Sequence, residues 1–247
     1  APASRKPAET RFSDSLKSDE MAAADIHADE GGFDTVAQMA ANTWEQVLSR
    51  IEVEGADERE MGIFYSNLYH TLVKPSDRPG DSPFWGCKPG EDFTVDFCTL
   101  WDIYKTQMPL LMTLFPEFGS KVLSTFAQIG RVGDGFPIAL MVDSDLYRCF
   151  GQAAMLAEYI ICDAFWRGVP GDYDALLDLT DKDLAKPTIA EIVQGGTPRR
   201  LTHLLDVCEG CGNMADLAET LGRQDLAAKW RKIADRWTEA YDPAPGL

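Results

Sequence analysis

The segment DFCTLWDIYKTQMPLLMTLFP, residues 96–116, is the longest strongly apolar stretch of the chain. Taken as one helix, it is apolar nearly all round, which is typical of a helix buried by its neighbours. Four other side chains then fall at spacings of four, three and four, on a single stripe: Cys98, Asp102, Lys105 and Pro109. Burying a carboxylate and an ammonium is costly unless they are paired or face water. The stripe therefore forms an internal ion pair, or it faces a polar pocket with Trp101 as an apolar wall.

The composition is that of a globular protein with an acidic surface. The chain has 247 residues, of which 45% are hydrophobic and 26% charged, as in ordinary globular domains. With 23 basic and 40 acidic residues the net charge is −17, which argues against binding to nucleic acid or anionic membranes. No signal peptide is recognisable. Because Ala1 could follow a processing site, the location is left open.

The cysteines do not form a recognisable metal or redox motif. Cys208 and Cys211 make a lone CxxC, with no second ligand pair for zinc and no βαβ setting for a thioredoxin-like site. They are interpreted as helix cysteines, and zinc or redox chemistry there is the weaker alternative. Asp134, Asp143 and Asp145 lack the pattern of a calcium loop, so turn and capping roles are expected for them.

Helical periodicity dominates after a polar arm or linker at residues 1–30, so residues 31–247 are expected to form one helical domain. The expected helices cover 33–50, a helix capped by Asp57, 96–115, 117–130, 145–167, 172–184, 199–221 and 224–241. Loops are expected at 74–95, 130–144 and 185–198, and no strand is expected. Two of these helices, 96–115 and 145–167, are apolar all round, whereas 33–50, 117–130 and 224–241 are amphipathic. This alternation predicts an all-α fold of inner and outer helices, an incomplete (α/α)6 toroid. A bundle or solenoid is the plainer alternative.

Three sequence blocks closely resemble family 92 of the glycoside hydrolases, the calcium-dependent α-mannosidases. They are FYSNLYHTLVKPSD (64–77), FCTLWDIYKTQMPLLMTLFP (97–116) and DGFPIALMVDSDLYRCFGQAAMLAEYIICDAFWRGV (134–169). RRLTHLLDVCEGCGNMADLAETLG (199–222) and AYDPAPG (240–246) follow in the family's order. The resemblance implies inverting hydrolysis of α-mannosides, a bound calcium ion and a secreted or periplasmic location.

The resemblance transfers few site residues. It implies that Trp101 and Asp102 contact the hydroxyls of the sugar, and that Lys105 stands where the family usually has arginine. Ile138-Ala139, Phe150-Gly151-Gln152 and Cys208–Cys211 also depart from the family pattern. The general acid, the base and the main calcium ligands are expected outside this chain, so activity of the chain alone is not expected.

Two further residues are candidates for sugar contact. Asp163, near the end of the second apolar helix, could cap, pair or bind ligand. His70 is interpreted either as a core histidine or as a wall of the sugar site. Two functions stay open: part of an inverting α-mannosidase, or a non-catalytic module that binds carbohydrate or protein. Half a toroid also predicts exposed apolar flanks, and hence self-association or a companion chain.

Overall fold

The computed structural model describes residues 10–28, 31–140, 152–195 and 201–240. The described residues form two compact units, Ala1–Val73 and Lys74–Leu247. The division falls inside the range expected as one helical domain. The fold is mostly helical, as expected, and no helix among the described residues is long and apolar enough to cross a membrane.

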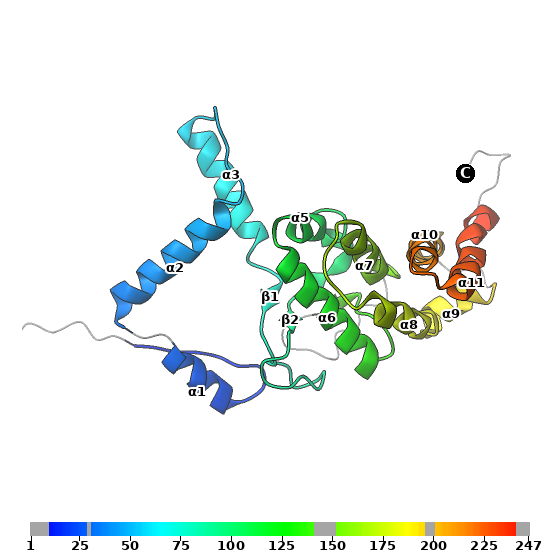
Figure 1. Cartoon of the computed structure of the whole chain (residues 1–247), viewed down its shortest axis with the longest axis horizontal. Coiled ribbons are helices and arrows are strands. Elements are labelled where there is room, and N and C mark those ends of the chain that lie inside the picture. The colour runs from blue at the N-terminus through cyan, green and yellow to red at the C-terminus, as the bar shows by residue number, and fades with distance from the viewer. Residues whose placement is uncertain (1–9, 29–30, 141–151, 196–200, 241–247) are drawn as a thin grey trace, which may run out of the picture. The chain divides into compact units, whose positions relative to one another are not determined.

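The first unit consists of three helices: α1 (Asp19–Ala28), α2 (Phe33–Leu48) and α3 (Glu58–Thr71) (Figure 1). Asp57 caps α3 as predicted, because its carboxylate accepts from the Glu60 amide while the Glu60 side chain accepts from the Asp57 amide. None of the residues of α2 is buried, and Leu68 is the one buried residue of α3. These two amphipathic helices therefore bury few side chains and leave Phe33, Met39, Ile63 and Tyr69 exposed.

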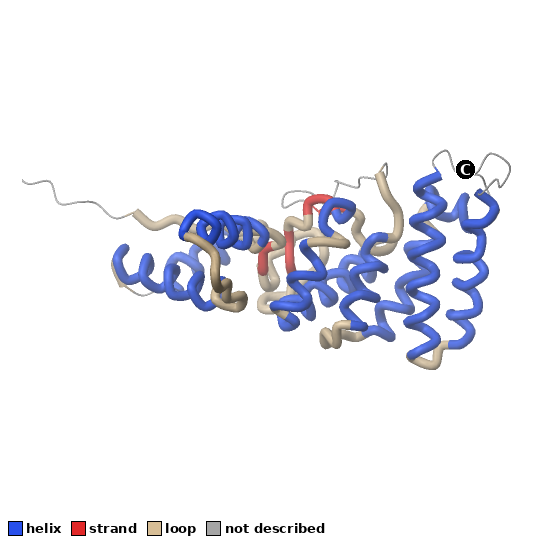
Figure 2. The backbone as a smooth tube through the Cα atoms, turned by 90° about the horizontal axis from the view of Figure 1, so that it is seen from above, coloured by secondary structure: helices blue, strands red, loops and turns tan. Residues whose placement is uncertain are grey.

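The second unit holds the remaining elements, seen as helices and short strands in Figure 2. The helices are α4 (Leu100–Ile103), α5 (Gln107–Leu114), α6 (Pro116–Val132), α7 (Leu156–Trp166), α8 (Tyr173–Leu184), α9 (Pro187–Val193), α10 (Leu201–Thr220) and α11 (Gln224–Ala234), with a 3-10 turn at Asp235–Ala240. The strands are β1 (Ser76–Asp77), β2 (Thr94–Val95), β3 (Cys98–Thr99) and β4 (Ala139–Leu140). β1 pairs with β2 and β3 with β4, both antiparallel.

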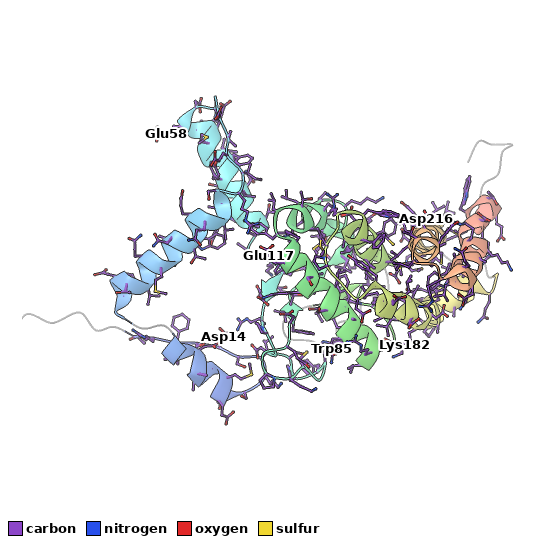
Figure 3. The ribbon with its side chains drawn as sticks, in the orientation of Figure 1. Asp14, Glu58, Trp85, Glu117, Lys182 and Asp216 are labelled. Atoms are coloured by element: carbon purple, nitrogen blue, oxygen red, sulfur yellow. The ribbon has the colours of Figure 1, made fainter. Side chains whose placement is uncertain are left out.

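The core of this unit lies around α6, which the sequence predicted closely. Its apolar side chains recur at helical spacing, and Val122, Phe126 and Ile129 are buried. The Phe126 ring packs against Phe97 with centroids 5.3 Å apart. Figure 3 labels Trp85 and Lys182, which contact the C-terminal half of α6 from opposite parts of the chain. The expected loop at 74–95 thus does pack onto the core.

The prediction of one helix over 96–115 was wrong. Cys98 and Thr99 pair with Leu140 and Ala139 in the β3–β4 ladder, so the first helical residue is Leu100. Pro109 then lies in the first turn of α5, where a proline needs no amide partner. In an unbroken helix its ring would clash with the carbonyl of residue 105 and remove a hydrogen bond. The chain therefore divides into α4 and α5, and the four residues of the supposed stripe do not share a helix face.

Three other sequence predictions need correction. The short strands were not expected. The helix expected at 145–167 is helical from Leu156, and its residues 145–151 lie outside the described residues. The loop expected at 185–198 contains α9, which starts at Pro187 and buries Ile189 and Ile192. Proline at the first helical position is favourable because its missing amide would have been unpaired there.

The C-terminal helices form a pair. α10 and α11 lie side by side (Figure 1), joined by Arg231 of α11 and Asp216 of α10 at 2.6 Å. Trp230 is completely buried, and its indole nitrogen donates to Asp181 of α8 at 3.1 Å. The expected helix at 224–241 is confirmed as α11 followed by the 3-10 turn, while Tyr241 lies outside the described residues.

Candidate functional site

The Leu100-Trp101-Asp102 segment is anchored to the core by Leu100 and exposes the side chain of Asp102. Leu100 is fully buried, and its amide donates to the Ile138 carbonyl at 3.0 Å as the β3–β4 ladder ends. The Asp102 carboxylate is exposed and accepts from the Thr99 hydroxyl. Trp101 is half-buried. A rigid backbone thus presents a carboxylate beside an aromatic ring, an arrangement suited to accepting hydrogen bonds from a polar ligand.

The turn before α4 is held by a second polar cluster. Lys74 pairs with Asp96 at 2.6 Å, and the Cys98 thiol donates to the other Asp96 oxygen at 3.1 Å. Asp96 and Cys98 have φ values of 62° and 51°, a left-handed conformation that is strained for residues other than glycine. Burial, ahead of the nearby Asp96 carboxylate, raises the pKa of the Cys98 thiol. Cys98 therefore acts here as a hydrogen-bond donor.

Lys105 is paired with α10 and not with Asp102. Its ammonium lies 3.8 Å from Glu209 and 5.2 and 5.4 Å from the ring centroids of Tyr104 and Tyr159. These two rings meet edge to face, 5.3 Å apart. The idea that Asp102 and Lys105 form an internal ion pair was therefore wrong, since each has its own partner and both are exposed.

α10 supplies acidic groups that the sequence analysis missed. Burial most of all, and then a hydrogen bond with Glu209, raise the pKa of Tyr159. Asp206 is half-buried and accepts from the Ala154 amide at 3.2 Å. Burial likewise raises the pKa of Asp206. The available signal was the three-residue spacing of Asp206 and Glu209, which places both on one face of the helix.

The structure does not bring Asp163 together with the α4 residues. Asp163 pairs with Arg167 one turn later on α7, at 2.7 Å, and Arg167 also donates to Thr113 of α5 at 2.7 Å. Of the three roles left open for Asp163, the observed one is pairing. Among the described contacts, none joins Asp163 to Trp101, Asp102 or Lys105.

His70 belongs to the other unit and is exposed on α3, so the interpretation as a core histidine was wrong. Its ring lies against Tyr69, with centroids 5.5 Å apart. The idea that it forms a wall of the sugar site stays a prediction.

The CxxC cysteines lie on α10, as expected of helix cysteines, and both are buried. Cys208 donates to the Ile233 carbonyl at 3.3 Å, and Cys211 lies 3.8 Å from the Met155 sulfur. Burial raises the pKa of both thiols. Within the described ranges, no group of three or more His, Cys, Asp or Glu side chains is placed to hold a metal ion. Asp143 and Asp145 lie outside those ranges.

A buried ionic network of Asp183, Lys186 and the Phe136 backbone lies beside Glu158 of α7. Asp183 accepts from the Phe136 amide at 2.8 Å and pairs with Lys186, whose ammonium also donates to the Phe136 carbonyl at 2.6 Å. Glu158 is fully buried beside this pair, and neither of its oxygens has a hydrogen-bond partner of good geometry among the described residues. Burial first, and then the Asp183 charge, raise the pKa of Glu158 well above its usual range.

Glu158→Gln should therefore flatten the dependence of stability on pH. The folded state binds the Glu158 proton more tightly than the unfolded state does. The resulting contribution to the free energy of unfolding is therefore complete below the ordinary pKa of 4.5. It declines as pH rises from there towards the folded pKa. Glutamine cannot ionise, so the variant should gain stability relative to wild type as the pH rises above 4.5, as measured by urea unfolding across a pH series. The exposed control Glu219→Gln should keep the wild-type slope, and parallel curves for Glu158→Gln and wild type would contradict a protonated Glu158.

Comparisons with known proteins place the fold. Residues 19–247 match the glycosyl hydrolase family 92 catalytic domain. The structure is similar to the family GH92 inverting mannosidase BT2199 of Bacteroides thetaiotaomicron, with a TM-score of 0.75, 20% identity, and coverage of 93% of this chain and 34% of that one. It is also similar to the GH92 α-mannosidase BT3965 of the same organism. That match has a TM-score of 0.80 and 18% identity, and it covers 93% of this chain and 33% of the other.

BT3965 in complex with mannoimidazole matches with a TM-score of 0.79, at 18% identity and with coverage of 93% and 32%. No curated protein matched in a separate search. The chain thus spans about a third of the length of these enzymes. The expected all-α fold, part of an (α/α)6 toroid, is confirmed.

Proposed function

Because the chain belongs to glycosyl hydrolase family 92, we propose that it forms part of the catalytic module of an inverting α-mannosidase-like enzyme that acts on α-linked mannosides. The observation that carries the proposal is the exposed Asp102 carboxylate beside half-buried Trp101 on α4, anchored by the β3–β4 ladder within the matched region. The similar structures, one of them with mannoimidazole bound, support mannosides as the ligand class.

In this proposal the α4 segment holds the sugar. The Asp102 carboxylate accepts hydrogen bonds from ring hydroxyls, Lys105 donates to a sugar oxygen, and Trp101 covers an apolar face of the ring. Asp163 is a weaker candidate because Arg167 already occupies its carboxylate. His70, which belongs to the first unit, stays an untested candidate for sugar contact.

Inversion requires two carboxyl groups set far enough apart for a water molecule to fit between one of them and the sugar, about 6.5–9.5 Å. One group protonates the leaving oxygen and the other activates the water. We assign neither role to a residue of this chain and propose that other segments supply both. The chain's own contribution is to bind and orient the sugar.

We propose no calcium site within this chain. Calcium takes six to eight oxygen ligands, and the described residues offer no group of three or more acidic, histidine or cysteine side chains placed to hold a metal. They therefore do not fit a calcium site by themselves. We propose that the ion, if the complete enzyme uses one, is held by other segments, and we derive no step through it.

We also propose that a companion polypeptide or a second copy completes the toroid. Large apolar side chains on α2 and α3 are exposed, including Phe33 (70%), Ile63 (52%) and Met39 (48%). Such side chains gathered on amphipathic helices mark surfaces that other chains cover. A sedimentation experiment showing a monomer at all concentrations, and no capture of a complementing segment, would contradict this assembly.

Asp102→Asn is expected to weaken the binding of methyl α-mannoside about tenfold, because a charged acceptor becomes a neutral amide. Titration calorimetry on the purified chain measures this, and an assay for released sugar should show no hydrolysis by the chain alone. Asp225→Asn, an exposed change on α11, should bind like wild type. Wild-type protein that gives no heat of binding would contradict the proposed function, and equal affinity for wild type and Asp102→Asn would contradict the role of Asp102.

A further inference from the structure

The Lys105 ammonium contacts side chains from two other helices. Lysine carries its charge on a flexible four-carbon stem, so a fixed position requires partners. Here the ammonium has three: the Tyr104 ring at 5.2 Å, the Tyr159 ring of α7 at 5.4 Å, and the Glu209 carboxylate of α10 at 3.8 Å. Ring faces and carboxylate all attract a cation, and together they limit the directions in which Lys105 can point.

Resting on the proposed function, we propose that Glu209 and Tyr159 are positioning residues that hold Lys105 beside the α4 site and restrict that site to neutral sugars. Tyr159 makes two contacts in this arrangement. Its ring faces the Lys105 ammonium, and its hydroxyl is hydrogen-bonded to Glu209. The hydroxyl thus orients the carboxylate that in turn attracts Lys105.

The charge balance gives the selectivity. Lys105 faces two carboxylates on α10, Glu209 as its ion-pair partner and Asp206 on the same helix face, so these three side chains together carry a net charge of about −1 when ionised. Glu209 already neutralises Lys105, and the carboxylates of Glu209 and Asp206 would repel the negative charge of a phosphorylated or carboxylated sugar. A neutral hexoside meets no such repulsion. In this arrangement Lys105 binds sugar hydroxyls and does not bind a phosphate group.

The test uses Glu209→Gln and Tyr159→Phe in the full chain. Glu219→Gln, another exposed glutamate of α10 that pairs with Arg231, is the matched control. Proton–carbon NMR of labelled lysine, with Lys105→Met to assign the signal, reports whether the Lys105 methylenes stay over the tyrosine rings. Calorimetry measures the dissociation constants of methyl α-mannoside and mannose 6-phosphate for each variant.

Wild type should show Lys105 signals shifted upfield by the rings, and it should prefer methyl α-mannoside. Glu209→Gln should move the signals towards those of free lysine and increase the relative affinity for mannose 6-phosphate about fivefold. Tyr159→Phe should keep most of the ring shift and show a smaller change in preference, while Glu219→Gln should behave like wild type.

Two results overturn the inference: a Lys105 signal that Glu209→Gln does not move, or an unchanged sugar preference in a variant that still binds methyl α-mannoside. Wild type that binds neither sugar contradicts the proposed function and with it the selectivity. The positioning of Lys105 is then still decided by its NMR signal, which needs no ligand.

Discussion

Replacing Lys186 by methionine should lower the free energy of unfolding by about 3–5 kcal/mol, because it leaves a buried carboxylate without its cation. Lys186 and Asp183 are 5% and 1% exposed, and their ion pair is completed by the amide and carbonyl of Phe136. Methionine fills a similar volume, so the loss reports the charge and not a cavity. Urea unfolding followed by circular dichroism at pH 7 measures it.

The matched control is Lys229→Met, which breaks an exposed pair with Asp181 and should cost at most about 1 kcal/mol. If Lys186→Met fails to fold, the double variant Lys186→Met with Asp183→Leu provides a second measurement. Removing both charges leaves no orphaned ion, so it should recover a large part of the loss. A Lys186→Met chain as stable as Lys229→Met would contradict the account of this network.

Phe126→Ala should cost a similar amount, about 3–5 kcal/mol, by a different mechanism. Phe126 is completely buried at the centre of α6 and packs against Phe97, which precedes the β3 strand. Truncation removes buried apolar surface and leaves a cavity that the α6 core closes only in part. The same urea titration gives the loss.

Phe84→Ala is the control for this change. Phe84 is 44% exposed in the same unit, so its truncation should cost about 1 kcal/mol or less. Phe126→Leu should fall between the two. If Phe126→Ala and Phe84→Ala proved equally stable, α6 would not be the centre of the core.

Local signals in the sequence predicted the helices well where helix formation depended on nearby residues. The Asp57 cap and the apolar face of α6 could be identified because each is encoded within a few positions. α9 also had local signals, Pro187 at its start and buried Ile189 and Ile192 three apart, but the glycines and proline that follow favoured a loop.

The errors in the central segment come from contacts distant in sequence. Nothing near Cys98 indicates that it pairs with Leu140, and that ladder prevents a helix before Leu100. Pro109 was a local warning that was given too little weight. In the same way, Trp101, Asp102 and Lys105 are close together in the sequence, yet the partner of Lys105 lies about a hundred residues later, at Glu209.

An NMR titration of the full chain with methyl α-mannoside tests the proposed sugar site most directly. Binding at α4 should shift the Trp101 indole signal, the Asp102 amide and the Lys105 methylenes together, while the buried Trp230 indole stays in place. A spectrum in which these three signals do not move at saturating sugar, or in which other residues move in their place, would contradict a mannoside site at this segment.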